Sequence, residues 1–130
     1  MEAMQASRSM VIGAYDLMKV NGRVLPAPVD ETGVRDGEVI RCRIMAGEFR
    51  LEPDGSYHHA LTTRYDVAGA SYTRVLENGG TWRFISSPSD ESSGDVTLLS
   101  ENGRTTTAAV TRISLIQRDP GGLIWVYLRR

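Results

Sequence analysis

Residues 48–65 read EFRLEPDGSYHHALTTRY, and this stretch decides the fold. Asp54-Gly55 is a pair that tight β-hairpin turns favour, because glycine readily adopts the positive φ angles of such turns. Before and after this pair, large apolar side chains recur at every second position. A period of two is typical of a half-buried strand. The stretch therefore predicts a β-hairpin with strands at 48–53 and 56–66.

Turn signals recur along the rest of the chain at intervals of roughly 8–12 residues, a spacing typical of β-sandwiches and β-barrels. They are Asn21-Gly22, Asp36-Gly37, Ala46-Gly47, Asp54-Gly55, Ala68-Gly69, Asn78-Gly79-Gly80, Ser93-Gly94, Asn102-Gly103 and Asp119-Pro120-Gly121-Gly122. Runs rich in β-branched and aromatic residues lie between them, with little helical periodicity. The predicted strands are 12–20, 38–45, 48–53, 56–66, 71–77, 81–86, 95–100, 105–117 (one bent strand or two) and 123–129.

These elements predict an all-β fold, with loops at Pro26, Pro28 and 30–37 and again at 86–94. An antiparallel up-and-down meander barrel of about eight strands is the first choice, because closing a sheet removes its exposed edges; a β-sandwich is the second. Residues 11–130 are expected to form this single domain, and 1–10, which lack a pattern, a disordered or tag-like segment. An eight-stranded barrel is either filled by side chains or holds one small ligand.

Composition and charge exclude several classes of partner. Hydrophobic residues make up 41% of the 130 residues, and the formal net charge of −1 provides no field that would attract nucleic acid or acidic membranes. No apolar run approaches the roughly 20 residues that span a bilayer, and no signal peptide is visible. We expect a soluble protein without a nucleic-acid partner, either cytoplasmic or the mature form of an exported protein. Homo-oligomerisation is left open.

The two histidines and the single cysteine bear on metal and acid–base chemistry. His58 and His59 are adjacent, so on a strand they point to opposite faces and cannot readily bind one metal together. His59 shares a face with Tyr57 and is the candidate catalytic acid or base; the alternative is a histidine hydrogen-bonded to a neighbour in the core or at its rim. Cys42 alternates with isoleucines and predicts a buried, inert thiol. No metal site is predicted.

A set of aromatic residues is predicted to line the barrel interior. Rings that carry a polar atom offer a small molecule both apolar area and oriented hydrogen bonds. The candidate ligand-binding residues are Tyr15, Tyr57, His59, Tyr65, Trp82 and Tyr127. The alternative is a filled core in which these rings pack on each other.

Five short segments carry a resemblance to a known family. They are GAYDL at 13–17, VNGRVLP at 20–26, GEFRLEPDGSY at 47–57, GGTW at 79–82 and WVYLR at 125–129. In this order they resemble small bacterial lipocalin-like (calycin-type) β-barrel proteins over most of residues 11–130. The resemblance implies a meander barrel whose interior binds a small apolar molecule.

Three hypotheses for the function follow. The first is lipocalin-like binding of a small hydrophobic or aromatic molecule in the barrel, oriented by Tyr57, His59, Tyr65 and an inward arginine. The second is a cofactor-independent cyclase or isomerase, in which His59 or an acid transfers a proton in an aromatic pocket. The third is a structural or protein-interaction subunit with a filled barrel. No phosphate-binding or dinucleotide-binding glycine motif occurs, so no cofactor is expected.

Overall fold

The structure is a computed structural model, which describes residues 8–35, 38–67, 69–88 and 92–130. Within these residues it contains one short helix and ten strands. Their bounds are α1 Arg8–Val11, β1 Gly13–Val20, β2 Arg23–Val24, β3 Ala27–Arg35, β4 Glu38–Leu51, β5 Ser56–Val67, β6 Ala70–Ser86, β7 Ser93–Ser100, β8 Thr105–Thr111, β9 Ser114–Arg118 and β10 Ile124–Arg129.

The strands form one antiparallel sheet that closes on itself. Their order is β2-β1-β10-β9-β8-β7-β6-β5-β4-β3, and β1 also pairs with β4. That second pairing closes β1 and β4 through β10 into an eight-stranded barrel, in which each strand from β4 to β10 neighbours the next in sequence. The predicted all-β, up-and-down barrel is therefore confirmed, with β2 and β3 as two additional strands.

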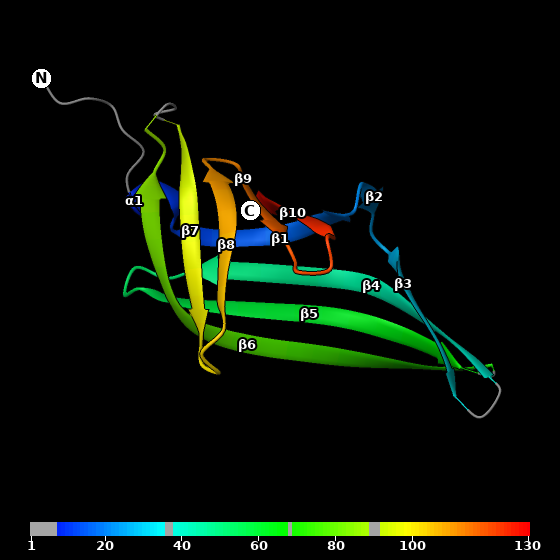
Figure 1. Ribbon diagram of the computed structural model, residues 1–130. Helices are drawn as coiled ribbons and strands as arrows, with labels where there is room; N and C mark the ends of the chain where they lie inside the picture. The colour runs from blue at the N-terminus through cyan, green and yellow to red at the C-terminus, as the bar shows by residue number, and fades with distance from the viewer. Residues whose placement is uncertain (1–7, 36–37, 68, 89–91) are drawn as a thin grey trace, which may run out of the picture.

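Three of the barrel strands are much longer than the others. Figure 1 shows β4, β5 and β6 lying side by side and running beyond the rest of the barrel, with β3 along the far part of β4. This sheet extension uses the outer parts of β4 and β5 and the first half of β6. The antiparallel ladder of β5 and β6 is continuous from Val67 opposite Ala70 to Ser56 opposite Thr81.

The closing pair of strands is held by backbone pairing and by charge. Gly13–Asp16 of β1 pairs with Glu48–Leu51 of β4. At the end of this ladder the Arg130 guanidinium contacts the Asp16 carboxylate at 2.6 Å and the Glu48 carboxylate at 3.3 Å. Arg130 thus bridges the two strands that close the barrel. A hydrogen bond from Arg130 lowers the pKa of the Asp16 carboxyl group. The pKa of the Glu48 carboxyl group is also lowered, chiefly by a hydrogen bond from Arg50.

Three predicted turns lie within strands, which is a correction to the sequence analysis. Gly47 belongs to β4 beside a β-bulge, and a Cβ there would lie 2.9 Å from the Leu17 side chain. Gly79 and Gly80 belong to β6, where a Cβ on Gly80 would lie 1.9 Å from the backbone oxygen of Leu99. Glycine at these positions allows close approach of neighbouring strands rather than a chain reversal.

Consequently the predicted strand 38–45 and most of the predicted strand 48–53 belong to the single strand β4, which ends at Leu51, and 71–77 and 81–86 belong to the single strand β6. Gly94 is similarly inside β7 rather than in a turn. The run 105–117 forms two strands, β8 and β9, rather than one bent strand.

The predicted loop after the first strand is also wrong for most of its length. Residues 27–35 form β3, which pairs with β4 at the edge of the sheet extension. Pro28 is compatible with this position, because an edge strand needs ladder hydrogen bonds on one side only. Residues 36 and 37 lie outside the described residues, as do 89–91 of the predicted loop at 86–94.

The turns at Asn21-Gly22, Asp54-Gly55 and Asn102-Gly103 are confirmed. Asn21 has a φ of 53°, and Gly22, Gly55 and Gly103 also have positive φ angles. Tight hairpin turns require such positive φ angles, which is why the Asn-Gly and Asp-Gly pairs predicted turns.

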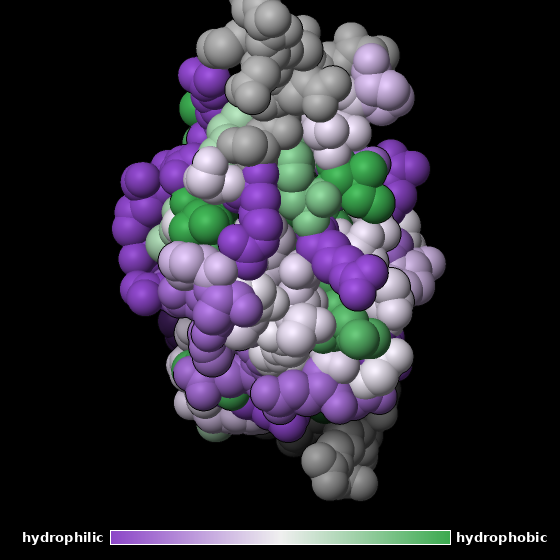
Figure 2. Space-filling model, turned by 90° about the vertical axis from the view of Figure 1, so that its left-hand side faces the viewer, coloured by the Kyte–Doolittle hydropathy of each residue, from purple (hydrophilic) through white to green (hydrophobic). Residues whose placement is uncertain are grey.

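One end of the barrel is closed by α1 and filled by large side chains. Val11 is fully buried, and its backbone oxygen accepts a 2.6 Å hydrogen bond from the Tyr15 hydroxyl. The Arg129 guanidinium donates to the backbone oxygens of Met10 and Ile12, which ties the helix to β10. Figure 2 views this end, where polar and weakly polar residues predominate and hydrophobic residues form separate spots. Of the segment predicted to be disordered or tag-like, 1–7 lie outside the described residues and 8–10 belong to α1.

Replacement of Gly80 by alanine tests the close approach of β6 and β7. The added methyl group overlaps the Leu99 backbone, so Gly80→Ala is expected to lower the free energy of unfolding by about 2 kcal/mol. Thr81→Ala, on the exposed adjacent position, is the control and should stay within about 0.5 kcal/mol of the wild type. Urea denaturation measures both, and equal stabilities for the two variants would contradict the packing described.

Candidate functional site

The barrel contains a cavity of about 260 Å³ at the end opposite the filled core around α1. Its deepest residues are buried, and its rim is formed by exposed residues of the β7–β8 and β9–β10 turns. The lining residues are Phe49, Tyr57, His59, Leu61, Asn78, Leu98, Ser100, Asn102, Arg104, Thr106, Gln117, Asp119, Pro120, Trp125 and Tyr127.

The alternation of β5 places its side chains in this cavity. Tyr57, His59 and Leu61 all line it, whereas His58 is exposed on the other face of the strand. His59 lies opposite Phe49 of β4 in the strand register and opposite Asn78 of β6. Three adjacent strands therefore bring their inward residues together around the His59 imidazole.

His59 sits between two aromatic rings at the base of the cavity. Its ring stacks on Phe49 with 4.4 Å between centroids and an interplanar angle of 25°. Its Nε2 lies 3.0 Å from the Tyr127 hydroxyl oxygen, a hydrogen-bonding distance. The Tyr127 ring also meets Phe49 edge-on at 5.0 Å. The three rings form a compact aromatic floor, defined here as Phe49, His59 and Tyr127.

The aromatic floor is electrically neutral near pH 7. Burial lowers the pKa of His59 from 6.5 to about 4, an effect that its hydrogen bond with Asn78 partly offsets. Burial also raises the pKa of the Tyr127 phenol. The contact between His59 and Tyr127 is thus a hydrogen bond between an uncharged imidazole and a protonated phenol.

The rim of the cavity is polar, and parts of it are fixed by internal hydrogen bonds. The Asp119 carboxylate accepts 3.0 Å hydrogen bonds from the Leu123 backbone N–H and from the Trp125 indole N–H. These two contacts orient both the turn and the indole. Gln117 donates a weaker hydrogen bond of 3.3 Å to the Thr106 hydroxyl across β8 and β9.

Arg104 is a rim residue whose backbone is held by hydrogen bonds and whose guanidinium has no ion-pair partner among the described residues. Its N–H donates to Ser100 Oγ and Asn102 Oδ1, each at 3.1 Å, and its carbonyl oxygen accepts from the Ser100 N–H. Its guanidinium forms no ion pair with any residue that the structure describes. A cation is therefore available at the rim.

The six candidate ligand-binding residues divide into three places. Tyr57, His59 and Tyr127 line the cavity together. Tyr15 and Trp82 are buried in the filled end, where the Trp82 indole donates to the Glu52 backbone oxygen and the Arg8 guanidinium covers its ring. Neither lines the cavity.

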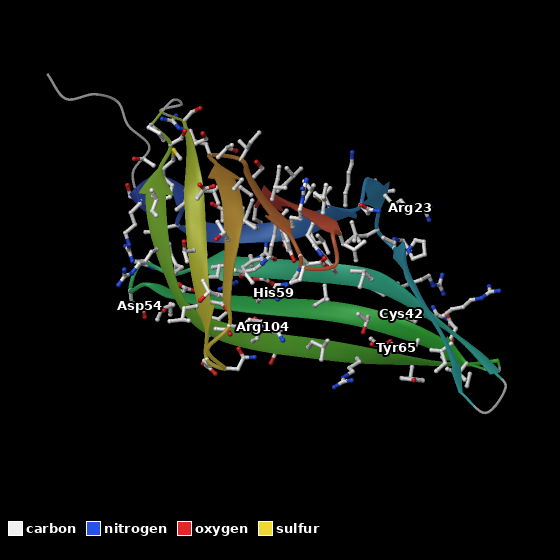
Figure 3. The ribbon with its side chains drawn as sticks, viewed as in Figure 1. Arg23, Cys42, Asp54, His59, Tyr65 and Arg104 are labelled. Carbon is white, nitrogen blue, oxygen red and sulfur yellow. The ribbon has the colours of Figure 1, made fainter. Side chains whose placement is uncertain are left out.

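Tyr65 lies in the sheet extension, away from the cavity. Figure 3 shows Tyr65 and Cys42 toward the far end of the long strands, whereas His59 and Arg104 lie near the barrel. The Tyr65 ring stacks on Tyr72 of β6, with 5.3 Å between centroids. Cys42 is buried, as expected for a thiol flanked by isoleucines, and it does not line the cavity.

Several cavity residues were not predicted, among them Phe49, Arg104, Gln117, Asp119 and Trp125. The topology contained a usable signal for those in the turns. In an up-and-down barrel every second turn lies at the same end, so the Asn102-Gly103 and Asp119–Gly122 turns belong at one rim. Which turn side chains face inward depends on the strand register, which alternation alone does not supply.

The described residues include no group of three or more His, Cys, Asp or Glu side chains placed to hold a metal ion. In the same part of the chain, no helix has the length and apolar character required to span a membrane.

The burial of His59 predicts a specific loss of stability on acidification. The unfolded chain binds a proton at pH about 6.5 and the folded chain only at about 4, so this contribution is complete above pH 6.5 and is lost as the pH falls toward 4. Between pH of about 7.5 and about 5 it amounts to roughly 2 kcal/mol. Urea denaturation at both pH values should show that His59→Gln lacks this loss.

His58→Gln is the matched control, because His58 is exposed on the opposite face of the same strand. It should retain the wild-type difference between the two pH values. If His59→Gln and His58→Gln show the same pH dependence as the wild type, His59 is not a buried neutral imidazole.

Comparison of the chain with protein-family models, curated proteins and solved structures gives no match. The assignment of a function therefore depends on the cavity itself: an aromatic floor, a polar rim and an arginine side chain without an ion-pair partner among the described residues.

Proposed function

We propose that this chain is a binding protein of the small bacterial lipocalin-like kind, which holds a small hydrophobic or aromatic molecule in the barrel. The observation that carries the proposal is an unfilled cavity of about 260 Å³ whose floor is made of aromatic rings. Ligand pockets commonly measure about 300–1,000 Å³. The volume of this cavity lies just below that range, so it suits a small ligand, of one or two rings.

The walls supply the affinity that such a ligand needs. A two-ring molecule buries roughly 150–250 Å² of apolar surface, which at about 25 cal/mol per Å² contributes about 4–6 kcal/mol before the entropic cost of association. Leu61 and Leu98 provide apolar contact on the sides, and the Tyr57 ring and Trp125 indole provide flat surfaces. The polar rim then orients the end of the ligand that faces solvent.

The pKa of His59 favours binding over the form of the cyclase or isomerase hypothesis in which His59 transfers the proton. A general base works best when its pKa lies near the operating pH, because it must be both deprotonated and basic. With a pKa of about 4, His59 is a weak base near pH 7 and is too rarely protonated to act as an acid. Its contact with Tyr127 instead suits a fixed, neutral surface for a ring.

The cavity also argues against the hypothesis of a purely structural subunit. That hypothesis requires a barrel filled by its own side chains, as the end near α1 is. The open end has room beside its aromatic floor, and its side chains are mostly held in place by hydrogen bonds within the protein. A preformed cavity with ordered walls binds a ligand without an additional cost of ordering.

A cavity-filling variant tests the proposal. Thr106 lines the cavity, so Thr106→Trp is expected to occupy the space that a ligand would use. With naphthylmethanol as the probe, at a hundredfold excess over its Kd, the wild type should gain about 2.7 kcal/mol of stability. Thr106→Trp should gain none. Thermal unfolding with and without the probe measures both.

Thr107→Trp is the matched control, because Thr107 is exposed on the outer face of the same strand. It should keep the wild-type stabilisation by naphthylmethanol. The proposal fails if the probe stabilises neither the wild type nor Thr107→Trp, or if it stabilises Thr106→Trp to the same extent as the wild type.

A further inference from the structure

We infer that the ligand is an aromatic acid, with its ring on the aromatic floor and its carboxylate or sulfonate bound by Arg104 at the rim. This inference rests on the proposed binding function and adds the chemical class of the ligand. It is carried by the position of one guanidinium at the rim of a cavity whose aromatic floor is uncharged.

The position of Arg104 is fixed by the turn that precedes it. Its backbone N–H and carbonyl groups are hydrogen-bonded to Ser100 and Asn102 across the β7–β8 hairpin. The side chain therefore starts from a defined point on the rim, and it lines the cavity. His59 lines the same cavity, although the two residues, both labelled in Figure 3, come from different parts of the sheet.

The Arg104 guanidinium has N–H donors that can bind an anionic ligand. It presents five N–H groups in a planar fork that matches a carboxylate, and no described carboxylate pairs with it. Asp119, the acidic residue that lines the cavity, already accepts hydrogen bonds from Leu123 and Trp125. Asp119 has no ion pair among these residues either, but its carboxylate oxygens are engaged by N–H donors, whereas no described carboxylate engages the Arg104 guanidinium.

The depth of the cavity sets the orientation of the ligand. A charged group placed on the floor would lose its hydration without gaining a counter-ion, because His59 is neutral and Tyr127 stays protonated. The same group at the rim keeps part of its hydration and meets Arg104. An aromatic acid satisfies both conditions when its ring enters first and its acid group remains at the mouth.

Other parts of the surface are less suitable for an acid. Arg43 and Arg64 in the sheet extension both contact the Asp66 carboxylate, at 2.9 Å and 3.3 Å. Arg130 is paired with Asp16 and Glu48. These guanidinium groups are already partly neutralised, and none of them lines the cavity that holds the aromatic floor.

The test compares two probes that share a ring system, naphthoate and naphthylmethanol, which differ in the charge of the substituent. Calorimetric titration gives the affinity of each probe for the wild type and for Arg104→Gln. A hydrogen bond between charged groups predicts that the ratio of naphthoate to naphthylmethanol affinity falls by about five- to tenfold in Arg104→Gln. Added salt should lower the same ratio in the wild type and have less effect in the variant.

Arg83→Gln is the matched control. Arg83 is exposed on β6, forms no ion pair with a described residue and does not line the cavity. It removes the same charge from the protein and should leave the affinity ratio unchanged. Only binding that Thr106→Trp abolishes is counted, so that probe bound elsewhere does not enter the ratio.

The outcomes separate this inference from the function on which it rests. If naphthylmethanol binds in the cavity and Arg104→Gln leaves the affinity ratio unchanged, the ligand is not recognised as an acid and only this inference is overturned. An equal fall of the ratio in Arg83→Gln would also overturn it, because net charge would then be the cause. If neither probe binds in the cavity of the wild type, both proposals fail.

Discussion

The pairing of β1 with β4 is the constraint on which the rest of the structure depends. Without it the ten strands would form an open sheet, and the inward side chains would face solvent. Closure gives that face a limited volume and requires close approach between strands, which glycines at 47 and 80 allow. Arg130 supports the same closure by joining Asp16 to Glu48. The cavity exists because this volume is filled at the end near α1 and not at the other.

The polar atoms of the aromatic side chains have different hydrogen-bond partners at the two ends of the barrel. At the filled end, Tyr15 and Trp82 donate their hydrogen bonds to backbone oxygens, so their rings act as core residues. At the open end, His59 and Tyr127 bond to each other and form part of the cavity wall. The polar atoms are thus satisfied in both places, and the difference lies in whether a free volume adjoins the rings.

Alternation along the strands was enough to predict part of the cavity lining. It placed Tyr57 and His59 on the inward face of one strand, and closure of the barrel brings Tyr127 beside them. The same alternation suggested Tyr65, but β5 continues beyond the barrel before it reaches that residue. Strand length relative to the barrel is set by pairing between distant segments, and a local period of two carries no information about it.

A glycine in the sequence does not by itself show whether the chain turns at that position. Gly55 reverses the chain, whereas Gly80 allows two strands to approach, and both occur in similar sequence surroundings. Their backbone angles distinguish them: φ is positive at Gly55 and not at Gly80. The position of Arg104 was likewise not predictable from a local pattern, because it depends on the hydrogen bonds that hold its backbone in the β7–β8 turn.

The central claim is that a ring-containing molecule occupies the open end of the barrel. The most direct measurement is of nuclear Overhauser effects between bound naphthylmethanol and methyl groups of the protein. We expect contacts to Leu61 and Leu98, which line the cavity, and none to Val75 and Leu76, which are exposed on the sheet extension. Contacts confined to Val75 and Leu76, or contacts to none of the four residues, would contradict it.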